Sequence, residues 1–191
     1  MRIVTFDIET ANWFGEGVED MKDLQIALVG IHDSETDSYQ SFLEPELPQL
    51  WPILERTDIL VGWNSDHFDV PLLNKYYPGD LTKIKSLDLM MEIYNSLGRR
   101  LRLDAVADGT LNDKKLDGKG GQSVIWWRAG EVEKVREYCL HDVKLTKKIL
   151  DHALKNNSVK YKELGAVREI KLDTSQWLAP KTAPMTFTLG L

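Results

Sequence analysis

The chain has 191 residues, 42% of them hydrophobic, and a formal net charge of -6. This length predicts one well-buried core and about one domain. The acidic balance argues mildly against a histone-like or sequence-specific nucleic-acid binder, because such proteins usually carry a basic surface. It is compatible with an enzyme whose acidic site holds metal ions.

The sequence also gives an expectation about the compartment. Every apolar run is shorter than the roughly 18 residues that a membrane span needs, and the first ten residues have the pattern of a strand and not of a signal peptide. The only cysteine, Cys139, cannot form an internal disulfide and has no second thiol for a cysteine-based metal site. We therefore expect a cytoplasmic protein without membrane contact.

The first half of the chain predicts an antiparallel meander followed by alternating helix and strand. Apolar alternation and turn-rich separators predict three strands, at residues 1–10, 24–33 and 38–45. Residues 46–57 have helical spacing despite Pro52, and the compact apolar run at 58–64 is typical of a buried strand.

The second half predicts more helix than strand. We expect a helix over 70–77, a short strand and helix over 84–98, a small helix over 103–112 and a long helix from about 130 to 156. Residues 111–123, rich in Gly, Lys and Asp, predict a loop, and 159–174 alternate around Gly165 like a hairpin. The whole pattern predicts an α/β fold in which a mixed sheet is flanked by helices.

The long helix places a carboxylate on its apolar face. At about 100° per residue, Asp142 lies about 20° from the centre of the apolar arc, Tyr138 about 60° from it and His141 about 120°. A lone carboxylate there has a large desolvation cost unless it is paired, protonated or bound to a cation. A partner Arg or backbone group is a common structural explanation. On geometry, Tyr138 can share a site with Asp142 and His141 cannot.

Two further acidic patterns precede this helix. In FDIET, Asp7 and Glu9 are two residues apart in a strand and face the same side, which is unfavourable for like charges without a cation. In GWNSDHFDVPLL, an apolar strand ends at Asn64 and Asp69 follows near the start of a helix, where it could equally be an ordinary helix cap. Each pattern alone is weak, but their occurrence in this order with Y-x3-D is far more specific.

Together these three motifs resemble the DEDD exonuclease superfamily in its tyrosine branch, and especially the 3′-5′ proofreading exonuclease domains of family-B DNA polymerases. The resemblance covers residues 1–155 and implies a ribonuclease H-like, three-layer fold for that domain, with 156–191 as an unassigned C-terminal hairpin and tail. The histidine branch would have His where this chain has Glu137. A chain of this length has no room for a palm domain, so we expect a stand-alone protein.

The resemblance implies a function and roles for individual residues. The expected activity is a metal-dependent 3′-5′ exonuclease that acts on single-stranded or frayed 3′ ends, with DNA favoured, and releases mononucleotides. Two divalent ions, Mg²⁺ or Mn²⁺, would be held by the four carboxylates, with Asp7 bridging both, Glu9 and Asp142 completing one site and Asp69 supporting the other. The Tyr138 hydroxyl would orient the attacking water.

Substrate contacts follow from the same resemblance and from local charge. The residues expected to touch the strand are Thr10, Trp13, Phe14, Asn64 and Phe68. Residues 99–128 carry seven Lys or Arg against four Asp, and this local excess of positive charge predicts a segment that contacts the phosphates of the nucleic-acid backbone. Trp126 and Trp127 could stack on bases, although packing in the core is the more common role of such a pair.

Two alternatives stay open at this point. The enzyme could be an RNA-trimming exonuclease, because the sequence contains no clear reader of the 2′-hydroxyl. The chain could also be a catalytically silent nucleic-acid-binding module docked on a helicase or polymerase, although four acids that repel one another serve no purpose in a scaffold.

Overall fold

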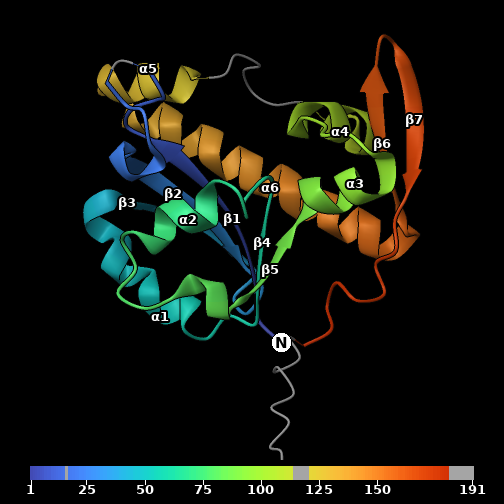
Figure 1. The fold of residues 1–191 in the computed structure, drawn as a ribbon, viewed down its shortest axis with the longest axis horizontal. Coiled ribbons are helices and arrows are strands. Elements are labelled where there is room, and N and C mark those ends of the chain that lie inside the picture. The colour runs from blue at the N-terminus through green and yellow to red at the C-terminus, as the bar shows by residue number, and fades with distance from the viewer. Residues whose placement is uncertain (16, 114–120, 181–191) are drawn as a thin grey trace, which may run out of the picture.

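The computed structural model describes residues 1–15, 17–113 and 121–180 (Figure 1). Its centre is a five-stranded sheet with the order β3-β2-β1-β4-β5. Strand β2 pairs antiparallel with both β1 and β3, whereas β4 pairs parallel with both β1 and β5. The strands are β1 (Ile3–Thr10), β2 (Ile26–Asp33), β3 (Ser38–Leu43), β4 (Ile59–Gly62) and β5 (Lys85–Asp88). The predicted antiparallel meander and mixed sheet are confirmed.

Alternation along β1 gives its two faces different roles. Val4, Phe6 and Ile8 are buried in one apolar cluster with residues of the helices α1 (Trp51–Leu54) and α2 (Asp69–Asn74). Because side chains in a strand point alternately to opposite faces, Asp7 and Glu9 are on the other face. That face is covered by the long helix α6 (Val132–Asn156), which crosses β1 and β2 (Figure 1).

Two predicted helices are shorter than their patterns suggested. The helix predicted for 46–57 is divided into a 3-10 turn, η2 (Glu44–Gln49), and the four-residue α1. Pro48 and Pro52 explain the division, since proline lacks the backbone N–H that continues an α-helix. The helix predicted for 70–77 begins at Asp69 and ends at Asn74. Two further 3-10 turns are η1 (Met21–Asp23) and η3 (Leu81–Lys83).

In the second half, α3 (Leu89–Leu97), α4 (Leu103–Leu111) and α6 confirm the predicted helices. A further helix, α5 (Gln122–Arg128), begins where a loop was predicted, and α4 ends at Leu111. The expectation that all of 111–123 is loop is therefore wrong at Leu111, Gln122 and Ser123. A seven-residue helix has too few turns for a clear 3.6-residue pattern, and Gly-rich flanks hide its start. Residues 114–120 of that predicted loop are outside the described residues.

The predicted hairpin is confirmed as β6 (Ser158–Glu163) and β7 (Ala166–Lys171), which turn at Leu164 and Gly165. Its buried Val159, Tyr161 and Ile170 share one apolar core with residues of α4 and α6. A boundary at residue 155 stays a prediction. Among the described residues, no helix combines the length and the apolar character that crossing a membrane requires.

Candidate active site

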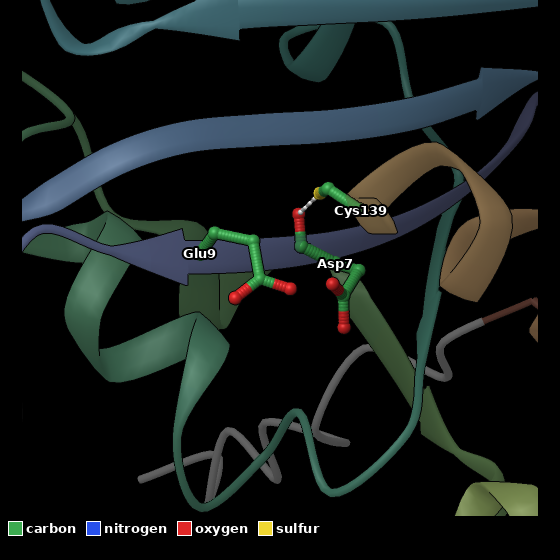
Figure 2. Close-up of side chains that lie close together, drawn as sticks. All are labelled: Asp7, Glu9 and Cys139. Carbon is green, nitrogen blue, oxygen red and sulfur yellow. Dashed lines mark hydrogen bonds between the residues drawn. The ribbon is translucent and has the colours of Figure 1, made fainter. Parts of the chain in front are cut away.

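The first two carboxylates project together from the last half of β1. Asp7 and Glu9 lie on the same side of the strand, and one oxygen from each lies within 4.8 Å of the other and of the Cys139 sulfur (Figure 2). The Cys139 Sγ donates a hydrogen bond to the backbone oxygen of Asp7 at 3.4 Å. Burial, followed by the charges of Asp7, Glu9 and Asp142, raises the pKa of the Cys139 thiol well above its ordinary value. The thiol therefore stays protonated in the absence of metal, and its hydrogen bond ties α6 to β1.

A glycine in β2 allows α6 to lie this close to the sheet. Gly30 pairs with Asp7 across the antiparallel ladder. A Cβ at this position would lie 2.8 Å from the Cys139 Sγ and 3.3 Å from side-chain carbons of Leu140 and Val143. Gly30 is not among the glycines with positive φ, so the requirement comes from helix packing and not from backbone conformation.

The third carboxylate comes from α6, as the helical pattern predicted. Asp142 is 2% exposed and Tyr138 is 7% exposed, and both belong to the buried face of the helix. Asp142 and Asp7 line the same cavity. His141 is half-buried and is not part of that lining. Tyr138 is absent from that lining as well, so the structure confirms that it shares the buried face of α6 with Asp142, while its place in the site stays a prediction.

Trp126 on α5 packs against Tyr138. The two ring centroids are 5.7 Å apart with an edge-to-face angle of 73°, an arrangement that aromatic pairs prefer. Trp126 and Trp127 are both partly buried against the small cluster of Leu28, Val135 and Cys139. This contact gives Trp126 a packing role against the tyrosine ring, and base stacking by Trp126 or Trp127 stays a prediction.

The fourth carboxylate belongs to the first residue of α2. Asp69 is 5% exposed, and its Oδ1 accepts a hydrogen bond from the backbone N–H of Ile8, between the two acids of β1, at 3.1 Å. It does not cap its own helix, whose N-cap residue is Phe68. Burial, then the Glu9 carboxylate and more weakly Asp88, raise the pKa of Asp69 well above the ordinary value despite the Ile8 hydrogen bond.

A tight turn after β4 delivers Asp69 to this place. A Cβ at Gly62 would lie 2.4 Å from the Ser65 Cβ, and Asn64 has a φ of 61°, a left-handed conformation that Asn tolerates better than most residues. The backbone N–H groups of Asn64 and Asp66 donate to the Asp88 carboxylate at 2.8 and 3.2 Å.

Asp88 is a site-shaping residue that the sequence analysis missed. It is 3% exposed and also caps α3, accepting hydrogen bonds from the N–H groups of Met90 and Met91. Burial raises its pKa, while the hydrogen bonds from the turn act in the opposite direction. The signal available in the sequence was an Asp between an apolar strand and a helix, which is typical of an N-cap. Nothing in that pattern reveals its second set of donors.

The residues expected to bind substrate differ in burial and in their neighbours. Thr10 ends β1, and Asn64 lines the cavity that Asp7 and Asp142 line. Trp13 is half-buried, with the Arg128 guanidinium 4.9 Å from its ring centroid, and Phe14 is 51% exposed. Phe68 is partly buried and packs against the core between the sheet and α2, so its side chain contributes to packing as well as being a candidate for substrate binding.

Four carboxylates from three chain segments therefore meet around one site. Hard divalent cations such as Mg²⁺ and Mn²⁺ prefer carboxylate oxygens, and the raised pKa of Asp69 shows that its negative charge is poorly compensated by the surrounding protein atoms. The donor set and its electrostatics fit divalent ions.

Comparison with known proteins identifies the fold. A family model described as RNase_H superfamily matches residues 4–154. Among proteins of curated function, the sequence has no match. Solved structures that resemble the chain include the family B DNA polymerase from the hyperthermophilic archaeon Pyrobaculum calidifontis, with a TM-score of 0.64 and 19% identity. The likeness covers 80% of this chain and 24% of the polymerase chain, so it shows a shared fold only.

Proposed function

Because the chain belongs to the RNase H superfamily, we propose that it is a metal-dependent 3′-5′ exonuclease. Its substrate is a single-stranded or frayed 3′ end, with DNA favoured, and its products are mononucleotides. The observation that carries this proposal is the meeting of Asp7, Glu9, Asp69 and Asp142, with Tyr138 on the same buried helix face as Asp142. The fold shared with a family-B DNA polymerase supports it.

The carboxylates would hold two divalent ions. Asp7, which has an oxygen within 4.8 Å of one from Glu9 and lines a cavity with Asp142, would contact both ions. Glu9 and Asp142 would complete one ion site, and Asp69 would support the other. When bound, such ions lower the pKa of a coordinated water from about 15.7 and neutralise the charge that builds up on the leaving oxygen.

Tyr138 has the role of positioning the attacking water. A tyrosine hydroxyl with a pKa near 10 donates and accepts hydrogen bonds at neutral pH, but it is a poor base there. Edge-to-face packing on Trp126 holds the ring in one orientation, which reduces the entropy that the hydroxyl loses on ordering a water. Tyr138 is thus an orienting group.

The terminal nucleotide would lie between the end of β1 and the turn after β4. Trp13 and Phe14 offer aromatic faces for an unpaired base, and Thr10 and Asn64 offer polar groups close to the acids. Stacking on an aromatic side chain is worth about 1–3 kcal/mol per base and tolerates any sequence. This fits an enzyme that removes nucleotides without sequence preference.

The experiment that tests the proposal uses matched DNA and RNA oligonucleotides labelled at the 5′ end. Wild-type protein with Mn²⁺ should produce a ladder that shortens one nucleotide at a time, and EDTA should stop it. Asp142→Asn should be inactive under the same conditions. No shortening of either strand with metal would refute the proposal, and faster shortening of RNA would replace DNA with RNA as substrate.

A further inference from the structure

A cavity beside the proposed metal centre has an acidic wall and a basic wall. It has a volume of about 400 Å³. Asp7 and Asp142 line it on the side of the centre, and Trp63 and Asn64 line it from the turn after β4. On the other side, Arg100 and Arg102 line it from the segment between α3 and α4, together with Asp104 of α4, so this side has one more basic than acidic group. The carboxylates of Asp7 and Asp142 belong to the centre already described, whereas nothing in the proposed chemistry so far uses the arginines.

The chain presents both arginines to the same side. Helix α3 ends at a left-handed Gly98, and an extended segment leads to the start of α4. Leu101 and Leu103 are buried in the core, while the alternate residues Arg100 and Arg102 are exposed. All four residues line the cavity, the two leucines with buried side chains and the two arginines with exposed ones, so the buried leucines anchor the segment that carries the guanidinium groups.

The preceding arginine, Arg99, has a structural role and is therefore not a candidate for binding substrate. Arg99 makes two hydrogen bonds to the Glu163 carboxylate at 2.8 and 2.9 Å and lies over the Tyr161 ring, so it ties this segment to the hairpin.

Arg102 forms an ion pair with Asp104 at 2.9 Å, with side-chain exposures of 70% and 30%. Exposed pairs of this kind contribute about 0–1 kcal/mol and exchange readily for a stronger anion.

We propose that Arg100 and Arg102 bind backbone phosphates of the retained strand, on the 5′ side of the phosphodiester bond that is cut. This inference rests on the proposed function, since it takes the acids as the place of cleavage. Guanidinium groups match phosphate oxygens in bidentate geometry, and a basic wall next to an acidic metal centre recognises an anion that continues beyond the reacting phosphate. The substrate is therefore a strand of several nucleotides, and short fragments are poor substrates.

The primary test is strand binding in EDTA at low temperature, measured by fluorescence anisotropy of a 5′-labelled single-stranded oligonucleotide over a range of salt. The double variant Arg100→Gln with Arg102→Gln should bind at least tenfold more weakly. Loss of two phosphate contacts should reduce the slope of log affinity against log salt by about 1.4, since each contact on a single strand contributes about 0.7. Replacement of both arginines by lysine should retain the slope.

Arg56→Gln is the matched control, because Arg56 is exposed at the end of α1, where its side chain donates to the Pro52 carbonyl. It should bind like the wild type. Equal binding by the wild type and the double variant, including no binding by either, would overturn the inference, as would an equal loss in the Arg56 control.

A second readout separates this inference from the proposed function. With Mn²⁺, kcat/KM for the oligonucleotide should fall at least tenfold more in the double variant than kcat/KM for thymidine 5′-monophosphate p-nitrophenyl ester, which has no retained strand. Equal losses on both substrates would mean that the arginines act on the centre itself and would overturn the inference. If the wild type cleaves neither substrate but the binding difference persists, the exonuclease proposal fails and strand binding by these arginines stands.

Discussion

Replacement of Gly30 by alanine should disturb the candidate site through helix packing. Carbon and sulfur atoms in contact prefer separations of about 3.5–4.0 Å, so a Cβ at 2.8 Å from the Cys139 Sγ requires the sheet and α6 to separate by about 1 Å. Overpacking of this kind costs about 1–3 kcal/mol, and the lower entropy of the unfolded alanine chain returns about 0.4–1 kcal/mol. We expect a net loss of about 1–2 kcal/mol in urea unfolding.

The same displacement has a larger effect on activity than on stability. Asp142 and Tyr138 move with α6 while Asp7 stays on β1, and a misplacement of about 1 Å can cost about a hundredfold in rate. We expect Gly30→Ala to lower the single-turnover rate on an oligonucleotide by that order.

A double-mutant cycle identifies the cause. Cys139→Ala removes one buried heavy atom and should by itself cost about 1 kcal/mol. Because the substitution also removes the atom that the new Cβ meets, Gly30→Ala with Cys139→Ala should lose at least about 1 kcal/mol less than the sum of the single losses. Additivity within about 0.5 kcal/mol would refute the explanation by steric contact.

Three further outcomes follow from the structure. Tyr138→Phe should lower the single-turnover rate roughly ten- to a thousandfold while His141→Ala changes it little, and a larger loss for His141 would contradict the assignment of Tyr138. Trp126→Ala should slow the wild type about tenfold but have a much smaller effect in the Tyr138→Phe background, and equal factors in both would show that Trp126 does not act through the tyrosine. Burial raises the pKa of Asp33, but the hydrogen bonds led by that of Arg2 outweigh it and hold the pKa below the ordinary value, so this pair should stabilise the fold above about pH 4 and lose that stability as the pH falls through the folded pKa. Urea unfolding at a series of acidic pH values should show a shallower loss for Asp33→Asn, and an unchanged slope would exclude Asp33 as a cause.

The parts of the site that were predicted from the sequence depend on local periodicity. Asp7 and Glu9 share a face because strands alternate, and Tyr138 and Asp142 share one because they are one helical turn apart. These relations hold within a single element, whatever the rest of the chain does. The superfamily fold predicted for the domain is confirmed by the match over residues 4–154.

The parts that were not predicted depend on contacts between segments far apart in sequence. Asp88 accepts amide hydrogen bonds from a turn 22 and 24 residues before it, and Gly30 is required because of a helix more than a hundred residues later. The pairing of Trp126 with Tyr138 requires the helix α5, which its short length concealed. The local sequence pattern contains no information about such partners, because they are brought into contact only by the tertiary fold.

The claim on which the proposed chemistry depends is that the four carboxylates hold divalent cations, and thermal melts test it without any substrate. Wild type and Asp7→Asn are melted in EDTA and in millimolar Mn²⁺. In EDTA the variant should melt higher, because one of four mutually repelling charges is gone while the side-chain shape is kept. A cation at about 100 times its dissociation constant should stabilise the wild type by roughly 2.7 kcal/mol and the variant much less, so Mn²⁺ should reverse the order. A wild type that gains no stability from Mn²⁺, or a variant that melts lower than wild type in EDTA, would contradict a metal centre at Asp7.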